Sequence, residues 1–329
     1  MISVTRRQAC SLLCAAPLLP AQDHTPVLVP RLAGEWTRIA SAPDLGKFST
    51  PKQEVVDFAV WQALDGTWQA WSCIRHTAEP GATRLFYRWQ GRELTAPDWE
   101  PMGIALHAEP AFGERLGALQ APFVLNVAAE FRLYYTSGGR AFLLAGHDGK
   151  TFARRMTSPG RFGLFGPFEG DAEAKVVGGG GRDIMILHDG PRYIAYYTAN
   201  PDGLGKVYAR VSSNLADWSD PRVVAFGGEA GAGPYSAECP CVYRLPGTPH
   251  YYLFRTQRYA NPPETRVYRS QDPLSFGIGD DRSLVARLPL AAPELVLHRG
   301  VLHIAALMPD LKGLRIARLD FAPRLPLAG

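Results

Sequence analysis

The sequence lacks the features that mark several large classes of protein. After residue 21, no apolar run is long enough to cross a bilayer, and no helical period continues over ten residues. Basic and acidic residues are interspersed, with a net charge of +4 and no Lys/Arg run. No phosphate loop, dinucleotide fingerprint, Ser-His-Asp elbow or zinc motif occurs. We therefore expect no nucleic-acid partner, no cofactor and no metal.

The first residues are typical of an export signal. Arg6-Arg7 precede an apolar segment, residues 9–19, which is too short to span a bilayer, and a small residue, Ala21, offers a cleavage point. The arginine pair also resembles a twin-arginine signal. We predict a signal peptide over residues 1–21 and a secreted or periplasmic protein that leaves the membrane after cleavage. An uncleaved membrane anchor is the alternative.

Cysteine is scarce in the predicted mature chain. Cleavage after residue 21 would leave Cys73, Cys239 and Cys241, an odd number, so at least one thiol stays free. Cys239 and Cys241 are two residues apart in a predicted strand, at a separation that disfavours a direct disulfide. No His or Cys cluster completes a metal site around them. We interpret both as small buried apolar residues.

Glycine and proline are plentiful, at 33 and 28 residues, and they are spread along the chain. This distribution suits many short strands joined by tight turns. Five stretches resemble one another: each has a polar or proline-containing step, a short apolar strand, a turn and a second strand rich in aromatic or aliphatic residues. Their landmark residues are 65, 61, 55 and 56 positions apart, and they are Asp57, Pro122, Asp183, Glu238 and Glu294.

A repeat of this length, filled with strands and turns, is typical of a β-propeller. We predict an all-β fold over residues 22–329: a single five-bladed β-propeller of four-stranded antiparallel blades around a central channel. Asp65-Gly66, Asp189-Gly190 and Arg299-Gly300 mark hairpin turns. Residues 22–50 are an entry segment that can also donate a closing strand.

The predicted architecture brings sequence-distant carboxylates together. Innermost strands line the channel, so equivalent strand ends converge on one mouth, where we expect Asp57, Asp183 and Glu238, together with Gln120 and Glu294. Like charges at close range raise one another's pKa and favour one protonated member. A glycosidase needs this pairing, with one ionised carboxylate and one that donates a proton to the leaving oxygen.

These residues resemble a known family. Asp57, Arg182-Asp183 and Glu238-Cys239-Pro240 are similar to the catalytic motifs of the five-bladed propeller enzymes in glycoside hydrolase family 32, the invertases, inulinases and levanases. The resemblance implies an exported, retaining glycoside hydrolase that acts on oligo- or polysaccharides. In that reading Asp57 is the nucleophile, Asp183 stabilises the transition state through sugar hydroxyls, and Glu238 is the acid/base.

Two alternatives remain open. Ala121-Pro122, Ala292-Pro293 and Ser270-Gln271-Asp272-Pro273 look similar to glycoside hydrolase family 43, the inverting arabinanases and xylosidases, although the carboxylate layout favours family 32. The other alternative is a carbohydrate-binding propeller without turnover. In every case we expect a monomer whose partner is a carbohydrate.

Several polar and aromatic side chains are candidates for holding the sugar, because arginine and glutamine donate to hydroxyls and aromatic faces stack on sugar rings. The substrate-binding candidates are Trp61, Arg75, Gln120, Arg182, Arg255 and Glu294. Trp61 and Trp71 are also typical of packing between blades. Arg182 is expected to hold the neighbouring Asp183 ionised by charge pairing, and His188 is expected at the surface.

Overall fold

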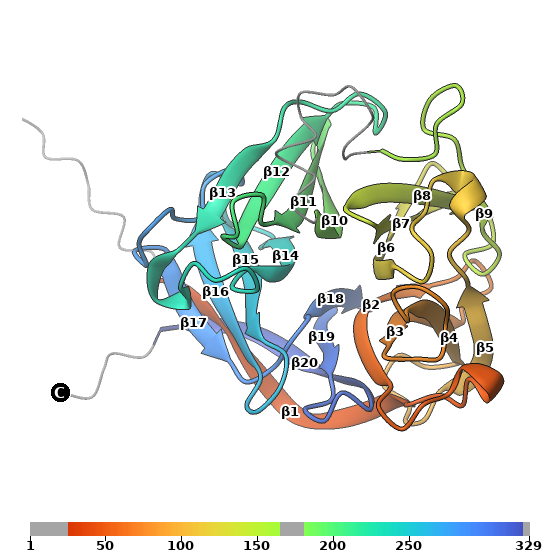
Figure 1. Ribbon diagram of the computed structural model, residues 1–329. Coiled ribbons are helices and arrows are strands. Elements are labelled where there is room, and N and C mark those ends of the chain that lie inside the picture. The colour runs from red at the N-terminus through yellow and green to blue at the C-terminus, as the bar shows by residue number, and fades with distance from the viewer. Residues whose placement is uncertain (1–25, 165–180, 325–329) are drawn as a thin grey trace, which may run out of the picture.

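The computed structural model describes residues 26–164 and 181–324, so the predicted leader lies outside the described residues. Five four-stranded antiparallel sheets form a ring around a central channel, as Figure 1 shows. The prediction of an all-β, five-bladed propeller is confirmed. The helical elements of the described part are three short 3-10 turns, Gly46–Phe48, Pro110–Phe112 and Gly228–Ala230. None of its helices is long and apolar enough to cross a membrane.

Each of the first four blades is built from consecutive strands, the innermost first. Blade I has strands β2 (Glu54–Gln62), β3 (Trp68–Arg75), β4 (Leu85–Gly91) and β5 (Glu100–Leu106). Blade II has β6 (Leu119–Val127), β7 (Glu130–Ser137), β8 (Arg140–Gly146) and β9 (Ala153–Arg154). Blade III has β10 (Arg182–Asp189), β11 (Arg192–Ala199), β12 (Lys206–Ser212) and β13 (Arg222–Phe226). Blade IV has β14 (Glu238–Arg244), β15 (Tyr251–Arg258), β16 (Glu264–Ser270) and β17 (Leu284–Leu288).

Blade V closes the ring with both ends of the described chain. It contains β18 (Glu294–His298), β19 (Val301–Leu307), β20 (Gly313–Pro323) and, as its outer strand, β1 (Leu28–Ser41). The β1–β20 ladder runs from the pair Leu28 and Pro323 to the pair Ser41 and Gly313. The closing strand expected from the entry segment is therefore present. Because it joins sequence-distant segments, it links the stability of the first blade to that of the last.

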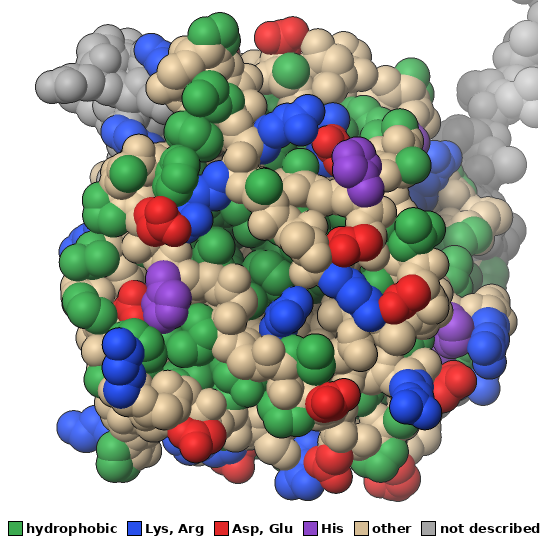
Figure 2. Space-filling view, turned by 90° about the vertical axis from the view of Figure 1, so that its right-hand side faces the viewer, with side chains coloured by type: hydrophobic (Ala, Val, Ile, Leu, Met, Phe, Trp, Pro, Cys, Tyr) green, Lys and Arg blue, Asp and Glu red, His purple; other side chains and the backbone are tan. Residues whose placement is uncertain are grey.

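Aromatic side chains fill the space between blades. Trp61 and Trp71 lie in tilted contact, and both meet Phe152 edge-on. The indole N–H of Trp61 donates to the carbonyl of Gly149 at 2.7 Å, which satisfies its one polar group. The packing interpretation of both tryptophans is confirmed. On the outer face shown in Figure 2, basic and acidic side chains are interspersed.

The innermost strands of blades I to IV carry an irregularity near their start. In β2, β6, β10 and β14 one extra residue interrupts the pairing with the next strand. In all five blades a non-glycine residue with positive φ stands at this point, a conformation that is costly for side chains with a Cβ. We call these the bulge residues: Asp57, Ala121, Asp183 and Cys239 in blades I to IV, and in blade V Ala292, which stands just before β18 without a register shift. Their φ values run from 39° to 59°.

The bulges correct the alignment of the repeats. The residue before the bulge is paired with a threonine in three blades: Gln120 with Thr136, Arg182 with Thr198 and Glu238 with Thr256. Glu238 is therefore equivalent to Arg182 and Gln120, and not to Asp57 and Asp183 as the sequence alignment assumed. Side chains on either side of a bulge point in different directions because the extra residue changes the alternation of the strand.

The closing strand offers a direct test of the fold. Ile39 in β1 is fully buried. Ile39→Ala should lower the free energy of unfolding by about 2–5 kcal/mol through lost burial and a cavity, measured by urea denaturation. Ser41→Ala, at the exposed end of the same strand, is the control and should change it by less than about 0.5 kcal/mol. Equal effects of the two substitutions would contradict the closing role of β1.

Candidate active site

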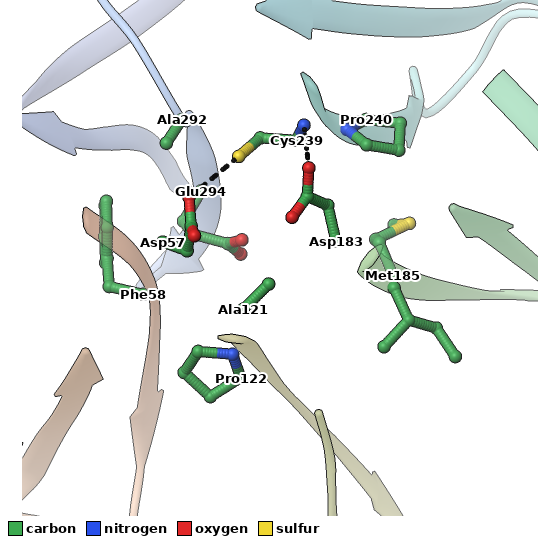
Figure 3. Close-up of a pocket in the computed structure, with 11 residues that line it drawn as sticks. Asp57, Phe58, Ala121, Pro122, Asp183, Met185, Cys239, Pro240, Ala292 and Glu294 are labelled. Carbon is green, nitrogen blue, oxygen red and sulfur yellow. Dashed lines mark hydrogen bonds between the residues drawn. The ribbon is translucent and has the colours of Figure 1, made fainter. Parts of the chain in front are cut away.

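Two neighbouring spaces that share the lining residue Asp57 lie among the innermost strands. The outer cavity has a volume of about 380 Å³ and is lined by Asp57, Arg75, Arg84, Gln120, Arg182, Tyr235, Glu238 and Tyr259. The inner pocket, shown in Figure 3, has about 20 Å³, enough for roughly one water molecule. Its polar lining comes from Asp57, Asp183, Cys239 and Glu294. Asp57 borders both spaces.

Asp57 is held at the floor of the outer cavity by neutral donors. The hydroxyl of Tyr259 donates to Oδ1 at 2.7 Å, and the Cys239 thiol donates to the same oxygen at 3.4 Å. Cys239 and Tyr259 also contact each other, with Sγ 3.0 Å from the hydroxyl oxygen. The side chain is 6% exposed. The bulge at Asp57 and these two contacts orient its carboxylate with Oδ1 anchored.

Asp183 lies deeper than Asp57. The backbone N–H of Cys239 donates to its Oδ2 at 3.0 Å, whereas Oδ1 is buried without a hydrogen-bond partner in the described part of the chain. Burial, followed by the nearby charges of Glu238 and Asp57, raises the pKa of Asp183 well above its ordinary value. The expectation that charge pairing keeps Asp183 ionised is therefore wrong: burial favours its neutral acid.

Arg182 forms its hydrogen-bonded ion pair with Glu238, and its contact with Asp183 is longer. Its Nε donates to Oε2 of Glu238 at 3.0 Å, and its Nη2 donates to Oε1, which makes a bidentate ion pair. Its Nε is 3.9 Å from the nearest oxygen of Asp183. Two further acceptors, Oδ1 of Asn200 and the carbonyl of Pro234, anchor the same guanidinium. Arg182 thus positions the Glu238 carboxylate over the outer cavity.

Glu294 does not share the mouth with the other candidates. It lines the inner pocket and not the outer cavity, because it stands two residues after the bulge residue Ala292. Figure 3 shows carboxyl groups from three blades facing this small space. Burial raises the pKa of Glu294 to about 8. As a result, a second carboxyl group besides Asp183 holds its proton near neutral pH.

Two predicted substrate-binding residues lie elsewhere. Trp61 is packed between blades, as described above. Arg255 is 1% exposed and donates from Nε to the carbonyl of Ser236 at 2.9 Å and from Nη1 to that of Gly227 at 3.4 Å. It braces the loop that precedes β14 and does not line either space. Arg75 and Gln120 do line the outer cavity, as predicted.

Sequence reasoning missed three residues of the outer cavity. Arg84 stands just before β4, Tyr259 just after β15 and Tyr235 in the loop before β14. Tyr235 is 71% exposed and its ring lies over the Arg182 guanidinium, 5.8 Å from centroid to Cζ. None of the three stands at an innermost strand, where the repeat pattern directed attention. The one signal for Tyr259 in the sequence was an aromatic residue directly after a strand rich in buried side chains.

Three side chains of the inner pocket lie close enough together to be considered as ligands for a metal ion, but their chemistry does not favour binding one. Asp57, Asp183 and Cys239 each place one ligand atom within 4.8 Å of the others. Burial and the neighbouring Asp183 and Asp57 charges raise the pKa of the Cys239 thiol well above its usual range, however. A thiol binds metals as the thiolate. The group is better described as hydrogen-bonded carboxyl groups, and Cys239 is a polar member of the site rather than the buried apolar residue that we expected.

No family model and no curated protein matches the sequence. A thermostable family-43 glycoside hydrolase matches the structure with a TM-score of 0.57 at 16% identity, covering 85% of this chain and 96% of that one. The catalytic domain of a family-62 α-L-arabinofuranosidase from Coprinopsis cinerea matches at 0.58 and 14%, covering 88% and 98%. A family-32 β-fructofuranosidase from Bombyx mori matches at 0.54 and 14%, covering 85% and 60%.

These matches define the class to which the fold belongs, the five-bladed propellers on which several glycoside hydrolase families are built. At these identities the likeness concerns the fold alone. Because family 43, family 62 and family 32 are all represented, the narrower resemblance to family 32 is not confirmed.

The raised pKa of Glu294 predicts a pH effect on stability. In the unfolded chain this carboxyl group titrates near 4.5, and in the folded protein at about 8. The folded state therefore keeps a proton that the unfolded state has released, and stability is lost as the pH rises through this window. Glu294→Gln should remove that loss. Between roughly pH 5 and pH 9, the melting temperature of the wild type should fall more steeply than that of the variant. The exposed Glu100→Gln is the control, and parallel curves for wild type and Glu294→Gln would contradict the assignment.

Proposed function

We propose that this protein is a glycoside hydrolase that cleaves glycosidic bonds of oligo- or polysaccharides. The observation that carries the proposal is the pair of carboxylates, Asp57 and Glu238, which face one cavity of about 380 Å³ at the channel mouth. They come from different blades: Asp57 is the bulge residue of blade I, and Glu238 stands just before the bulge residue of blade IV. The fold, shared with structures of glycoside hydrolases, supports the same conclusion.

The two carboxyl groups are suited to different roles. Asp57, oriented by Tyr259 and Cys239, attacks the anomeric carbon, and its carboxylate leaves again when water hydrolyses the intermediate. Glu238 takes up a proton from solvent when Arg182 releases one of its oxygens, and this acid protonates the leaving oxygen. The resulting carboxylate then takes a proton from the attacking water, which restores the acid. For the protonation of the leaving oxygen, a substrate oxygen must replace Arg182 at one Glu238 oxygen. Arg182 stays anchored meanwhile, because Asn200 and Pro234 also accept from it.

Asp183, which lines the inner pocket, assists the proposed reaction without touching the outer cavity. A neutral Asp183 avoids a third negative charge beside Asp57 and Glu238, whose charges act on it directly. Its unpartnered Oδ1 is the atom through which it would stabilise a transition state, as the family resemblance suggests. Around the cavity, Gln120 offers hydrogen bonds to hydroxyls, and the exposed ring of Tyr235 offers a face to a sugar. Export to the periplasm or the exterior and a monomeric state remain predictions from the sequence.

An inverting enzyme is the second candidate, favoured by the family-43 glycoside hydrolase among the structural matches. In that case Asp57 would activate a water molecule as a general base instead of attacking the sugar. The residues are the same, and only the distance between the two carboxyl groups in the complex with substrate would differ.

Substitution of the acid tests the proposed activity. Glu238→Gln keeps the size of the side chain but cannot donate the proton, so release of reducing sugar from fructans, arabinans, xylans or aryl glycosides should fall by about 10²–10⁴-fold. Binding of the cleaved substrate should persist, measured by calorimetry. Glu264→Gln, on β16 of the same blade, should leave the rate unchanged. Binding without cleavage of any substrate by the wild type would instead indicate a carbohydrate-binding propeller.

The stereochemistry of the product tests the role of Asp57. If Asp57 is the nucleophile, two displacements occur and the anomeric configuration is retained. We expect the first product seen by proton NMR, before mutarotation, to have the configuration of the substrate. Inversion would assign Asp57 as a base and favour the family-43-like alternative.

A further inference from the structure

Three guanidinium groups line the outer cavity, and they differ in their partners. Arg182 is paired with Glu238 as described, and Nε of Arg75 is 2.6 Å from Oε2 of Glu54. Arg84 forms no ion pair with any carboxylate in the described part of the chain. The cavity therefore contains one arginine whose charge has no bonded counter-ion.

Arg84 has a fixed backbone and an unsatisfied side chain. Its N–H donates to the carbonyl of Gly117 at 2.8 Å, which holds it at the boundary between blades I and II. Its guanidinium interacts with the Cys73 thiol, which burial keeps neutral by raising its pKa and which itself donates to the carbonyl of Leu119. Within residues 26–164 and 181–324, no carboxylate or carbonyl oxygen accepts a hydrogen bond from the Arg84 side chain.

The nearest negative charge does not complete the site. Asp57 influences Arg84 electrostatically, yet no hydrogen bond or ion pair joins them. The Oδ1 atom of Asp57 is taken by Tyr259 and Cys239 instead. Asp57 is thus held by neutral donors, although a cation stands nearby. This arrangement leaves the guanidinium of Arg84 available to a ligand.

Arg75 adds further donors beside Arg84. It uses Nε toward Glu54, whereas its two terminal amino groups have no hydrogen-bond acceptor among the described residues. The charges of both arginines act on the same Cys73 thiol, so the two guanidinium groups lie in one neighbourhood. Half-buried N–H groups of a cation are costly to leave without acceptors. A carboxylate or a sulfate group, each with at least two acceptor oxygens, would satisfy them with bidentate, charge-assisted bonds.

We propose that the outer cavity recognises a sugar that carries an anionic group, a carboxylate or a sulfate, and that Arg84 together with Arg75 binds that group. The sugar itself rests on the proposed function. A neutral hydroxyl would also accept hydrogen bonds, but it would leave the charge of Arg84 without a counter-ion. The substrate class is therefore a glycan that contains uronic acid or sulfated sugar units.

Matched ligand pairs that differ in charge test this inference. The catalytically impaired Glu238→Gln protein is titrated by calorimetry with D-galacturonate and its uncharged methyl ester, and with galactose 6-sulfate and galactose. We expect at least one charged ligand to bind about tenfold or more tightly than its neutral counterpart, with a preference that weakens as NaCl is added. The pair that shows the preference identifies the anion as carboxylate or sulfate.

Arginine variants in the same background locate the anion. Arg84→Gln should abolish the preference for the charged ligand, and Arg84→Lys should keep part of it because the charge remains without the planar fork. Arg88→Gln is the matched control: it lies four residues further along the chain, and its guanidinium donates to the carbonyl of Lys150, outside the cavity. Loss of the preference in Arg88→Gln as well as in Arg84→Gln would overturn the assignment to Arg84.

The outcome separates this inference from the proposed function. Equal affinity for the charged and neutral members of both pairs, or binding of none, overturns the inference, even if the wild type hydrolyses neutral glycosides. A preference for the anion that depends on Arg84 supports the inference, even if the wild type cleaves none of the glycans tested, neutral or charged.

Discussion

A left-handed residue at the start of each blade, within a bulge in blades I to IV, is the constraint on which the rest of the site depends. One residue per blade adopts a left-handed backbone conformation, and in blades I to IV it is an extra residue in the ladder. This conformation is costly for residues other than glycine and persists only where the surrounding structure holds it. Its effect is to direct Asp57, Asp183 and Cys239 toward the channel axis, while Arg182 and Glu238 reach the outer cavity. The bulges thus divide one channel into a wide mouth and a small, buried pocket.

The distribution of charge follows from this division. Below the bulges, burial raises the pKa values of Asp183 and Glu294. Above the bulges, three arginines line the outer cavity, and Glu238 is paired with one of them, Arg182. A protein that ionised all of these carboxyl groups together would meet strong repulsion. Neutral acids below and an ion pair above allow them to share one channel. The chemistry proposed here combines Asp57, which borders both spaces, with Glu238 in the outer cavity.

Much of the fold was predictable from local pattern. The five repeats, the glycine turns and the closing strand are each encoded over a few residues, and the structure confirms them. The site was less accessible. Asp57 and Glu238 were recognised because both stand near the start of an innermost strand. The main partner of Arg182 was not recognised, because its adjacency in sequence to Asp183 suggested that Asp183 would be its partner, whereas the hydrogen bonds go to Glu238. Arg84 and Tyr259 were missed, since they stand outside the innermost strands and follow no repeat.

The sequence by itself determined the number of blades and the candidate carboxylates, because strand length, turn chemistry and repeat spacing are properties of short segments. Only the tertiary structure decided which of these carboxylates meet. A single extra residue reverses the direction of every later side chain in a strand, and the repeat spacing of 55 to 65 residues does not reveal where that residue stands. The tertiary structure also decided that Arg84 lacks a carboxylate partner among the described residues, because ion pairs between blades depend on the packing of distant segments.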